Sequence, residues 1–198
     1  MVYSLLTMGH STHSAGRFLD LIRHFEVACV ADVRTKPASS RFPHFNQRPL
    51  SNALKTSGIR YWWVGDALGG LPTDPAMFTE GRADYAKMSQ APTFLAGIDE
   101  IIERSAHTRL ALLCSEHEPL ECHRFLLIAR ELSERGIEIY HILRSGSIET
   151  QQEAEDRLLL LRRRAVAQCI NRADQLNVAY RVQASRFSFR APQVGCCA

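Results

Sequence analysis

Two short, uninterrupted apolar runs constrain the fold of this chain more than any other feature of its sequence. Residues 27–33 read VACVADV, and residues 110–114 read LALLC. Neither run alternates between polar and apolar residues, as a strand with one solvent-exposed face would. Both runs therefore predict strands that are covered on both faces, which is the usual situation in a parallel sheet.

Further strand-like segments alternate with helical patterns along the chain. Residues 3–8, 59–64 and 137–143 have the length and composition of strands. Apolar residues at helical spacing follow Ser14 and Pro92, and both residue types suit the first positions of a helix. Alternation of strands and helices at these spacings is typical of βαβ units.

The predicted fold class is therefore α/β: a single doubly wound domain whose mostly parallel sheet has about five strands, with helices on both faces. We assign residues 1–150 to this domain. Residues 151–198 would add a C-terminal helix and a weakly ordered tail, because the hydrophobic periodicity is weak beyond Cys169.

Charge balance and cysteine content limit the class of protein. The chain has 24 Lys and Arg against 21 Asp and Glu, a net charge of +3. This small excess permits an anionic ligand but lacks the concentrated basic run of a protein that coats nucleic acid. No apolar run approaches the about 20 residues that cross a bilayer, and the amino end lacks the charged start of a secretory signal. We expect a cytoplasmic protein with no membrane partner, whose six cysteines are mostly reduced.

The segment with the most reactive groups is RLALLCSEHEPLECHRFLLIARELSERG, residues 109–136. It begins as a strand and ends as a helix, and the polar loop between them carries thiols, carboxylates and imidazoles. Such a loop places its side chains at the carboxyl end of a sheet, where open α/β sheets bind ligands. We therefore expect the functional site in this loop.

Cys122 has the strongest claim to be reactive. We expect it in the first turn of the helix, where free backbone N–H groups would lower the pKa of its thiol. His123 and Arg124 would add positive charge beside it. The alternative is a buried, inert cysteine that faces the core.

Cys114, at the end of the preceding strand, could approach Cys122 and form a reversible disulfide or share a metal ion. It could equally be a simple core cysteine. Four zinc-type donors occur close together in this segment: Cys114, His117, Cys122 and His123. We assign no metal site, because an adjacent Cys and His on one helix do not easily face the same ion. A paired Cys-x-x-Cys motif is also missing.

Polar side chains follow the other predicted strands as well. His10 follows the first strand, while Asp32 and Arg34 close the second. The carboxyl ends of parallel strands lie at one edge of a sheet, so we expect these groups to converge with the loop described above. Arg34 and Arg124 could hold a phosphate or carboxylate, and Glu116 could act as a general base. A structural ion pair between Asp32 and Arg34 is the alternative.

The loop after the second strand mixes basic and aromatic residues: Arg41, Phe42, His44, Phe45 and Asn46. This composition could stack a base and hold a phosphate. The alternative is that its aromatic side chains pack against the domain.

Four segments of the chain resemble the family known as domain of unknown function 488. They are TMGHST at 7–12, ADVRTKPASSRFPHFN at 31–46, GIRYWWVGDALGG at 58–70 and LLCSEHEPLECHR at 112–124. The resemblance implies an α/β domain whose shared polar residues are the strand-end groups described above. It implies no reaction, so function must come from the site itself.

The leading hypothesis is an enzyme, a hydrolase or a transferase, that acts on a phosphate-bearing substrate such as a nucleotide or a component of nucleic acid. The catalytic candidates are Cys122, Glu116, Asp32 and His10. The candidates for substrate binding are Arg34, Arg41, Arg124, Asn46, His123 and Cys114. The alternatives are a redox- or metal-responsive binding module that uses Cys114 and Cys122, and a nucleic-acid-binding accessory protein. The sequence identifies no particular substrate, cofactor or oligomeric state.

Overall fold

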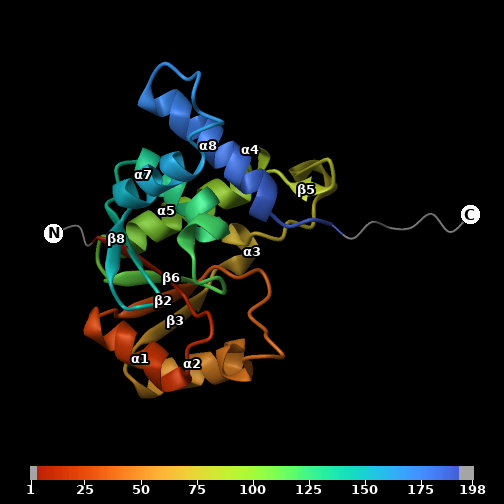
Figure 1. The fold of residues 1–198 in the computed structure, drawn as a ribbon. Coiled ribbons are helices and arrows are strands. Elements are labelled where there is room, and N and C mark those ends of the chain that lie inside the picture. The colour runs from red at the N-terminus through yellow and green to blue at the C-terminus, as the bar shows by residue number, and fades with distance from the viewer. Residues whose placement is uncertain (1–3, 192–198) are drawn as a thin grey trace, which may run out of the picture.

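The computed structural model describes residues 4–191, which form an α/β fold around a six-stranded, mostly parallel sheet (Figure 1). Its parallel strands are β1 (Leu5–Gly9), β2 (Cys29–Asp32), β3 (Arg60–Trp63), β6 (Leu110–Cys114) and β7 (Ile139–Ile142). Antiparallel β8 (Ile148–Thr150) completes the order β3-β2-β6-β1-β7-β8. A separate hairpin consists of β4 (Phe78–Thr79) and β5 (Arg82–Ala83). The predicted fold class is confirmed.

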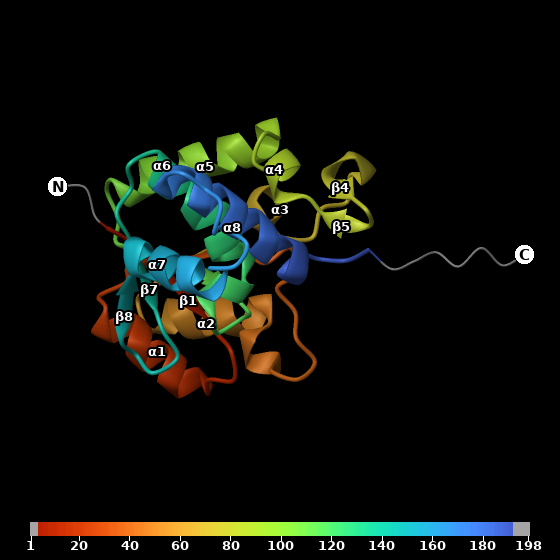
Figure 2. The same ribbon diagram turned by 45° about the horizontal axis from the view of Figure 1, so that its top comes forward.

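Helices cover both faces of the sheet (Figures 1 and 2). On one face lie α1 (Ala15–His24) and α2 (Gln47–Thr56). The other face carries α3 (Gly65–Leu68), α4 (Tyr85–Met88), α5 (Pro92–Ser105), α6 (Arg130–Glu134), α7 (Gln151–Leu161) and α8 (Arg172–Phe187). Short 3₁₀ turns at Pro43–Phe45, Pro75–Met77 and Pro119–Glu121, and a π-helical segment at Arg124–Ala129, complete the secondary structure.

The uninterrupted apolar runs arise because the central strands are buried on both sides. In β6, Leu110, Leu112 and Cys114 pack into the core beneath α5 and α6. Ala111 and Leu113, which point the other way, pack into the core beneath α1 and α2. Every side chain of this strand thus enters one of two hydrophobic cores, which leaves no position for a polar residue.

Several predicted element boundaries are confirmed. Ser14 is the N-cap of α1, and its hydroxyl accepts from the backbone N–H of Arg17. Pro92 is the first residue of α5, where its missing N–H costs nothing. Strand β3 lies at the edge of the sheet, and its residues Tyr61, Trp62 and Trp63 are only half-buried. No strand among the described residues flanks β3 on its outer side.

Several elements were not predicted, among them β8 and α8. Strand β8 has three residues and no apolar run. Helix α8 is 16 residues long and lies where the periodicity is weak. It buries only Ala179, Tyr180 and Gln183, so most of its surface faces solvent and its apolar stripe is too narrow to recognise. Residues 196 and 197, two of the cysteines, lie outside the described part of the chain.

The connections between strands create a crevice at the carboxyl edge of the sheet. Strands β1 and β2 continue into helices on one face, whereas β6, which lies between them, continues into helices on the other face. Open α/β sheets bind ligands where neighbouring connections diverge in this way. The loop of residues 115–121 after β6 occupies this position. In the part of the chain that the structure describes, no helix has both the length and the apolar character to cross a membrane.

Candidate functional site

A buried arginine holds the loop after β6 in place. Arg124 is fully buried, and its Nη1 and Nη2 donate to the carbonyl oxygens of Glu116 (2.5 Å) and His117 (3.0 Å). Gly9 at the end of β1 lies against the same loop, since a Cβ there would come 1.7 Å from the Glu116 carbonyl oxygen. Only glycine permits this close approach of the two chain segments.

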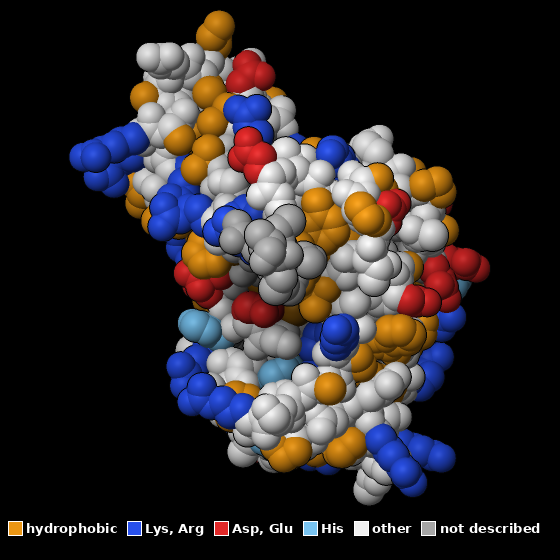
Figure 3. Space-filling model, turned by 90° about the vertical axis from the view of Figure 1, so that its right-hand side faces the viewer, with side chains coloured by type: hydrophobic (Ala, Val, Ile, Leu, Met, Phe, Trp, Pro, Cys, Tyr) orange, Lys and Arg blue, Asp and Glu red, His pale blue; other side chains and the backbone are white. Residues whose placement is uncertain are grey.

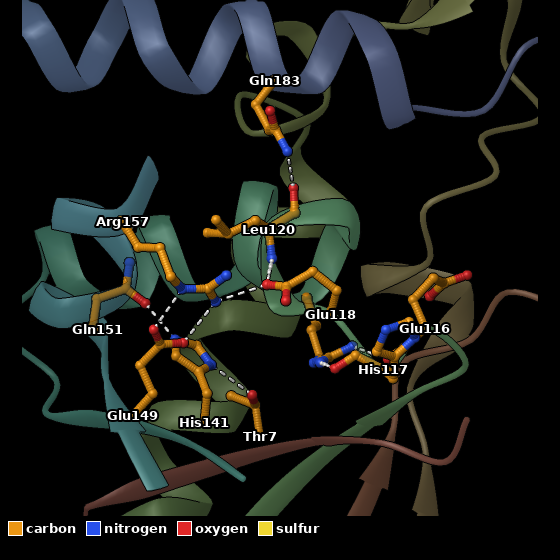
Figure 4. A network of polar contacts seen from close by, with 11 residues as sticks. Thr7, Glu116, His117, Glu118, Leu120, His141, Glu149, Gln151, Arg157 and Gln183 are labelled. Carbon is orange, nitrogen blue, oxygen red and sulfur yellow. Dashed lines mark hydrogen bonds and ion pairs between the residues drawn. The ribbon is translucent and has the colours of Figure 1, made fainter. Parts of the chain in front are cut away.

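Side chains from α7 and α8 fix the far half of the loop (Figure 4). Arg157 pairs with Glu118 at 2.7 Å and with Glu149 of β8 at 2.7 Å. The Glu118 carboxylate also accepts from the backbone N–H of Leu120, and Gln183 of α8 donates to the Leu120 carbonyl at 2.6 Å. The loop is thereby held by elements that lie up to 63 residues away in the sequence.

Four chemically reactive groups converge inside this loop. The thiols of Cys114 and Cys122 lie 3.0 and 3.1 Å from the same oxygen, Oε2 of Glu116. Nδ1 of His123 lies 3.4 Å from Sγ of Cys114 and 3.9 Å from Sγ of Cys122. All four donor atoms lie within 4.8 Å of one another. We call these four residues the Cys–Glu–His cluster.

The backbone at Cys122 explains how adjacent residues can face one point. Cys122 ends the 3₁₀ turn with extended dihedrals, φ −127° and ψ 142°, while His123 precedes the π-helical segment. The prediction that Cys122 sits within the first helical turn is thus wrong. The sharp change of direction at this residue turns both side chains toward Glu116.

Burial and neighbouring charge set the pKa values in the cluster. Burial raises the pKa of the Cys114 thiol well above its usual value, and its hydrogen bond to the charged Cys122 sulfur raises it further. Burial also opposes ionisation of Cys122, but the hydrogen bond from Cys114 and the charge of Arg124 outweigh it and hold the Cys122 pKa well below its usual value. Burial and the negative charge of Cys122 raise the pKa of Glu116. The ionisation of one thiol is therefore coupled to that of the other.

His123 is oriented by a second hydrogen bond. Its Nε2 lies 3.0 Å from the carbonyl oxygen of Val33, which can only accept, so Nε2 carries a proton and Nδ1 points to the cluster. Gly70 lies against the other side of the ring, since a Cβ at this position would come 2.8 Å from the imidazole. The imidazole is therefore confined between two backbone segments.

Asp32 and Arg34 form the structural ion pair that we considered as an alternative. Arg34 donates to Asp32 through Nε (2.9 Å) and Nη2 (2.6 Å), and Nη2 also donates to the carbonyl of Phe45 (2.8 Å). The hydroxyl of Tyr61 donates to the other side of the Asp32 carboxylate at 2.8 Å. Among the described residues, Nη1 of Arg34 has no partner, which leaves one edge of the guanidinium for a ligand.

A pocket of about 290 Å³ opens beside the cluster. Three members of the cluster line it, and Cys122, only 1 % exposed, lies behind them. Basic residues Arg34 and Lys36 also line the pocket, together with aromatic Tyr85, Phe187 and Phe189. On the face shown in Figure 3, acidic and basic side chains are interspersed. The described side chains visible there form no continuous basic track of the kind that follows a nucleic-acid backbone.

The other candidate residues lie outside this pocket. His10 is buried and stacks on Phe45 at 4.3 Å; burial and the charge of Arg34 lower its pKa to about 4. Arg41 is exposed and lies over Phe42, and Asn46 accepts from the backbone of the same loop. Arg124 is buried and bonded to backbone carbonyls, so it positions the loop.

Nine pocket residues were absent from the sequence candidates, among them Lys36, Tyr85, Phe187 and Phe189. The position of Lys36 at the site could have been predicted from the sequence, because this residue lies two residues beyond Arg34 at the end of a predicted parallel strand. The sequence does not predict that Phe187 and Phe189 line the pocket. Their place there depends on the position of α8, which is set by packing between distant elements.

The fold and site define an α/β protein with a thiol-, carboxyl- and imidazole-bearing centre at the carboxyl edge of a parallel sheet. Residues 14–131 match the family model described as "Domain of unknown function DUF488", and the chain belongs to this family. The matched region contains the whole Cys–Glu–His cluster as well as Asp32, Arg34 and Lys36, whereas β1, α7 and α8 lie outside it. No curated protein and no solved structure matches the chain.

Proposed function

We propose that the protein is an enzyme that acts on a small phosphate-bearing substrate, of the nucleotide class, in the pocket beside the Cys–Glu–His cluster. One observation carries this proposal: a single pocket of about 290 Å³ combines Cys114, Glu116 and His123 with the basic residues Arg34 and Lys36. Acid–base groups next to anion-binding groups at the carboxyl edge of a parallel sheet are typical of enzyme sites.

The polar part of the pocket suits a phosphate group. Arg34 is held rigid by Asp32 and presents its free Nη1, and Lys36 is an exposed, flexible cation. A fixed guanidinium edge and a mobile ammonium can together contact several phosphate oxygens. Asp32 then acts as a positioning residue for Arg34.

The aromatic part of the pocket suits a planar ring. Phe187 is 39 % exposed, so part of its ring is available to a ligand in the pocket. Tyr85 and Phe189 line the same pocket. A nucleobase that stacks on such a ring gains about 1–3 kcal/mol. Phosphate and ring together favour a nucleotide-like substrate over a purely inorganic anion.

Glu116 is the proposed acid–base residue. Its carboxyl group is flanked by two thiols, and burial together with the charge of Cys122 raises its pKa toward the range in which a group can both accept and donate a proton. Cys114 is the thiol that lines the pocket, whereas Cys122 does not. A hydrolase or transferase reaction is consistent with these groups.

The binding step is tested by thermal shift and calorimetry with a panel of nucleotides and phosphorylated metabolites. We expect at least one to bind, and both Lys36→Ala and Phe187→Ala to weaken its affinity by about tenfold, equivalent to about 1.4 kcal/mol. Lys55→Ala, which removes an exposed lysine of α2 outside the pocket, is the matched control and should bind normally. Equal affinity in all four proteins would refute the assignment of the pocket.

The chemical step is tested with Glu116→Gln, which keeps the size of the side chain but cannot exchange a proton. We expect this variant to bind the identified ligand within about threefold of the unmodified protein and to lose turnover by about 10²–10⁴-fold, as measured by chromatography of the products. Unchanged turnover would exclude Glu116 as the acid–base residue.

A second candidate function is a redox-responsive binding module, which the proximity of the Cys114 and Cys122 sulfurs favours. In that case oxidation would pair the two thiols and change ligand affinity. Thiol titration before and after mild oxidation distinguishes the functions. A responsive module loses two thiols and its ligand together, whereas in the proposed enzyme Cys114→Ser should retain substrate binding.

A further inference from the structure

We infer that the Cys–Glu–His cluster is a binding site for a thiophilic divalent metal ion, of which Zn²⁺ is the representative. As an account of catalysis this inference rests on the proposed function, because the ion would lie beside the substrate pocket. As a binding site it stands on the geometry of the four residues alone.

The spacing of the donor atoms matches a tetrahedral site. Metal–sulfur and metal–nitrogen bonds of about 2.3 and 2.0 Å around a tetrahedral Zn²⁺ separate neighbouring donors by about 3.3–3.8 Å. In the cluster, four of these separations are 3.0, 3.1, 3.4 and 3.9 Å, and none exceeds 4.8 Å. Changes of up to about 1 Å in these separations would therefore bring all four donors to bonding distance of one ion.

The orientation of His123 has the form found at metal-binding histidines. A ligating imidazole usually donates its other N–H to a carbonyl or carboxylate, which fixes the ring. His123 does this through Nε2 to the Val33 carbonyl, and Gly70 closes off the far side of the ring. Nδ1 is thereby aimed at the two sulfurs without any change of rotamer.

The electrostatic surroundings favour an anionic ligand set. Arg124 is fully buried, its hydrogen bonds go to backbone carbonyls, and its Nε has no partner within the described residues. A buried cation needs a compensating negative charge nearby. Two thiolates and a carboxylate around a divalent ion carry a net charge of −1, which Arg124 would neutralise.

The exposure of the four residues distinguishes the roles of the ligands. Cys114, Cys122 and His123 are buried and held by β6, by the 3₁₀ turn and by the Val33 contact. Glu116 is exposed on its pocket side. Three fixed protein ligands and a fourth, replaceable position define a catalytic rather than a structural zinc site. Glu116 is the ligand that a substrate oxygen or a water molecule would displace, and only the displaced carboxyl group would be free for the acid–base role of the proposed function.

The test is metal binding by the full chain, measured without substrate. Reduced, chelator-treated protein is dialysed and titrated with Zn²⁺ and with Co²⁺, and bound metal is quantified by mass spectrometry. We expect one ion per chain, and a Co²⁺ spectrum with thiolate charge-transfer bands and the intense visible bands of tetrahedral coordination.

Variants define the ligands. Cys114→Ser and Cys122→Ser should each abolish stoichiometric binding and the thiolate bands. Glu116→Gln should retain the bands but weaken the affinity by about 10–100-fold, as loss of a replaceable oxygen ligand would. Matched controls are Cys169→Ser and His117→Ala, a cysteine and a histidine outside the cluster, which should bind like the unmodified protein. If Cys122→Ser fails to fold, Cys114→Ser and the Co²⁺ spectrum of the unmodified protein decide the question.

Absence of bound metal in the reduced protein would overturn the inference, and so would binding that persists in Cys114→Ser. Formation of a Cys114–Cys122 disulfide in the presence of excess Zn²⁺ would also overturn it. None of these results affects the nucleotide-binding test, which uses Lys36 and Phe187, residues that lie outside the metal set. Conversely, failure of nucleotides to bind would leave the metal site intact.

Discussion

The buried imidazole of His141 should make the stability of this fold strongly dependent on pH. His141 of β7 is completely buried between Thr7 Oγ1 (2.7 Å from Nδ1) and Gln151 Oε1 (2.9 Å from Nε2). Gln151 donates its amide to Tyr180, so its oxygen must accept from His141, and Thr7 donates to Nδ1. This arrangement is that of the neutral imidazole with its proton on Nε2. Burial and the charge of Arg124 lower the pKa of His141 to about 3.

The sign and size of the pH dependence follow from the difference in proton binding between the folded and unfolded states. Between about pH 3 and pH 6.5 the unfolded chain binds a proton at His141 and the folded chain does not, so the free energy of unfolding falls as the pH falls. Lowering the pH from 7.5 to 4.5 should therefore cost about 2.7 kcal/mol at this one site. The figure depends mainly on the unfolded pKa, so a folded pKa of about 4 would still give about 2.5 kcal/mol.

The assay is urea denaturation followed by the fluorescence of Trp62 and Trp63, at pH 7.5, 5.5 and 4.5. Other groups also titrate in this range, His10 among them, so the measured quantity is the difference between the unmodified protein and His141→Gln. The variant should be less stable at pH 7.5, and this deficit should shrink by about 2.7 kcal/mol at pH 4.5. His24→Gln, which removes an exposed histidine, is the control. A deficit that stays constant with pH would refute the neutral buried network.

Three further substitutions test the architecture of the site by denaturation. Gly9→Ala should destabilise the fold by about 1–3 kcal/mol, because the new methyl group overlaps the Glu116 carbonyl and displaces the loop; an unchanged midpoint would show that the loop moves freely. Asp32→Ala should lower the free energy of unfolding by about 3–5 kcal/mol, because it leaves Arg34 buried and unpaired. A loss below about 1 kcal/mol would contradict the stabilising role of this ion pair. Thr150→Ala removes the capping box of α7 and should cost about 1 kcal/mol; no loss would mean that the cap is dispensable.

Some features of the site were fixed by local sequence. The run of residues 110–114 is apolar at every position, and only burial on both faces of a parallel sheet accommodates such a strand. The carboxyl ends of parallel strands share one edge, so the positions of Asp32, Arg34, Cys114 and the following loop could be predicted together. These are consequences of side-chain periodicity and chain direction, which the sequence carries directly.

Which of the polar groups touch one another was decided only by the tertiary structure. Cys122 and His123 face one point because the chain turns from an extended residue into a π-helix, a change that depends on how the loop packs. Arg124 turns inward to backbone carbonyls, although its charge suggested a ligand contact. In both cases competing local conformations differ little in free energy, and distant contacts select one of them.

The sequence by itself determined the fold class, the edge of the sheet that carries the reactive groups and membership of the family. The tertiary structure decided that Glu116, rather than His117, completes the cluster and that α8 brings Phe187 to the pocket. The physical reason is the range of the interactions involved. Burial patterns repeat every few residues and can be read locally, whereas the distances in the cluster depend on hydrogen bonds such as that of Gln183 to Leu120, which joins segments 63 residues apart.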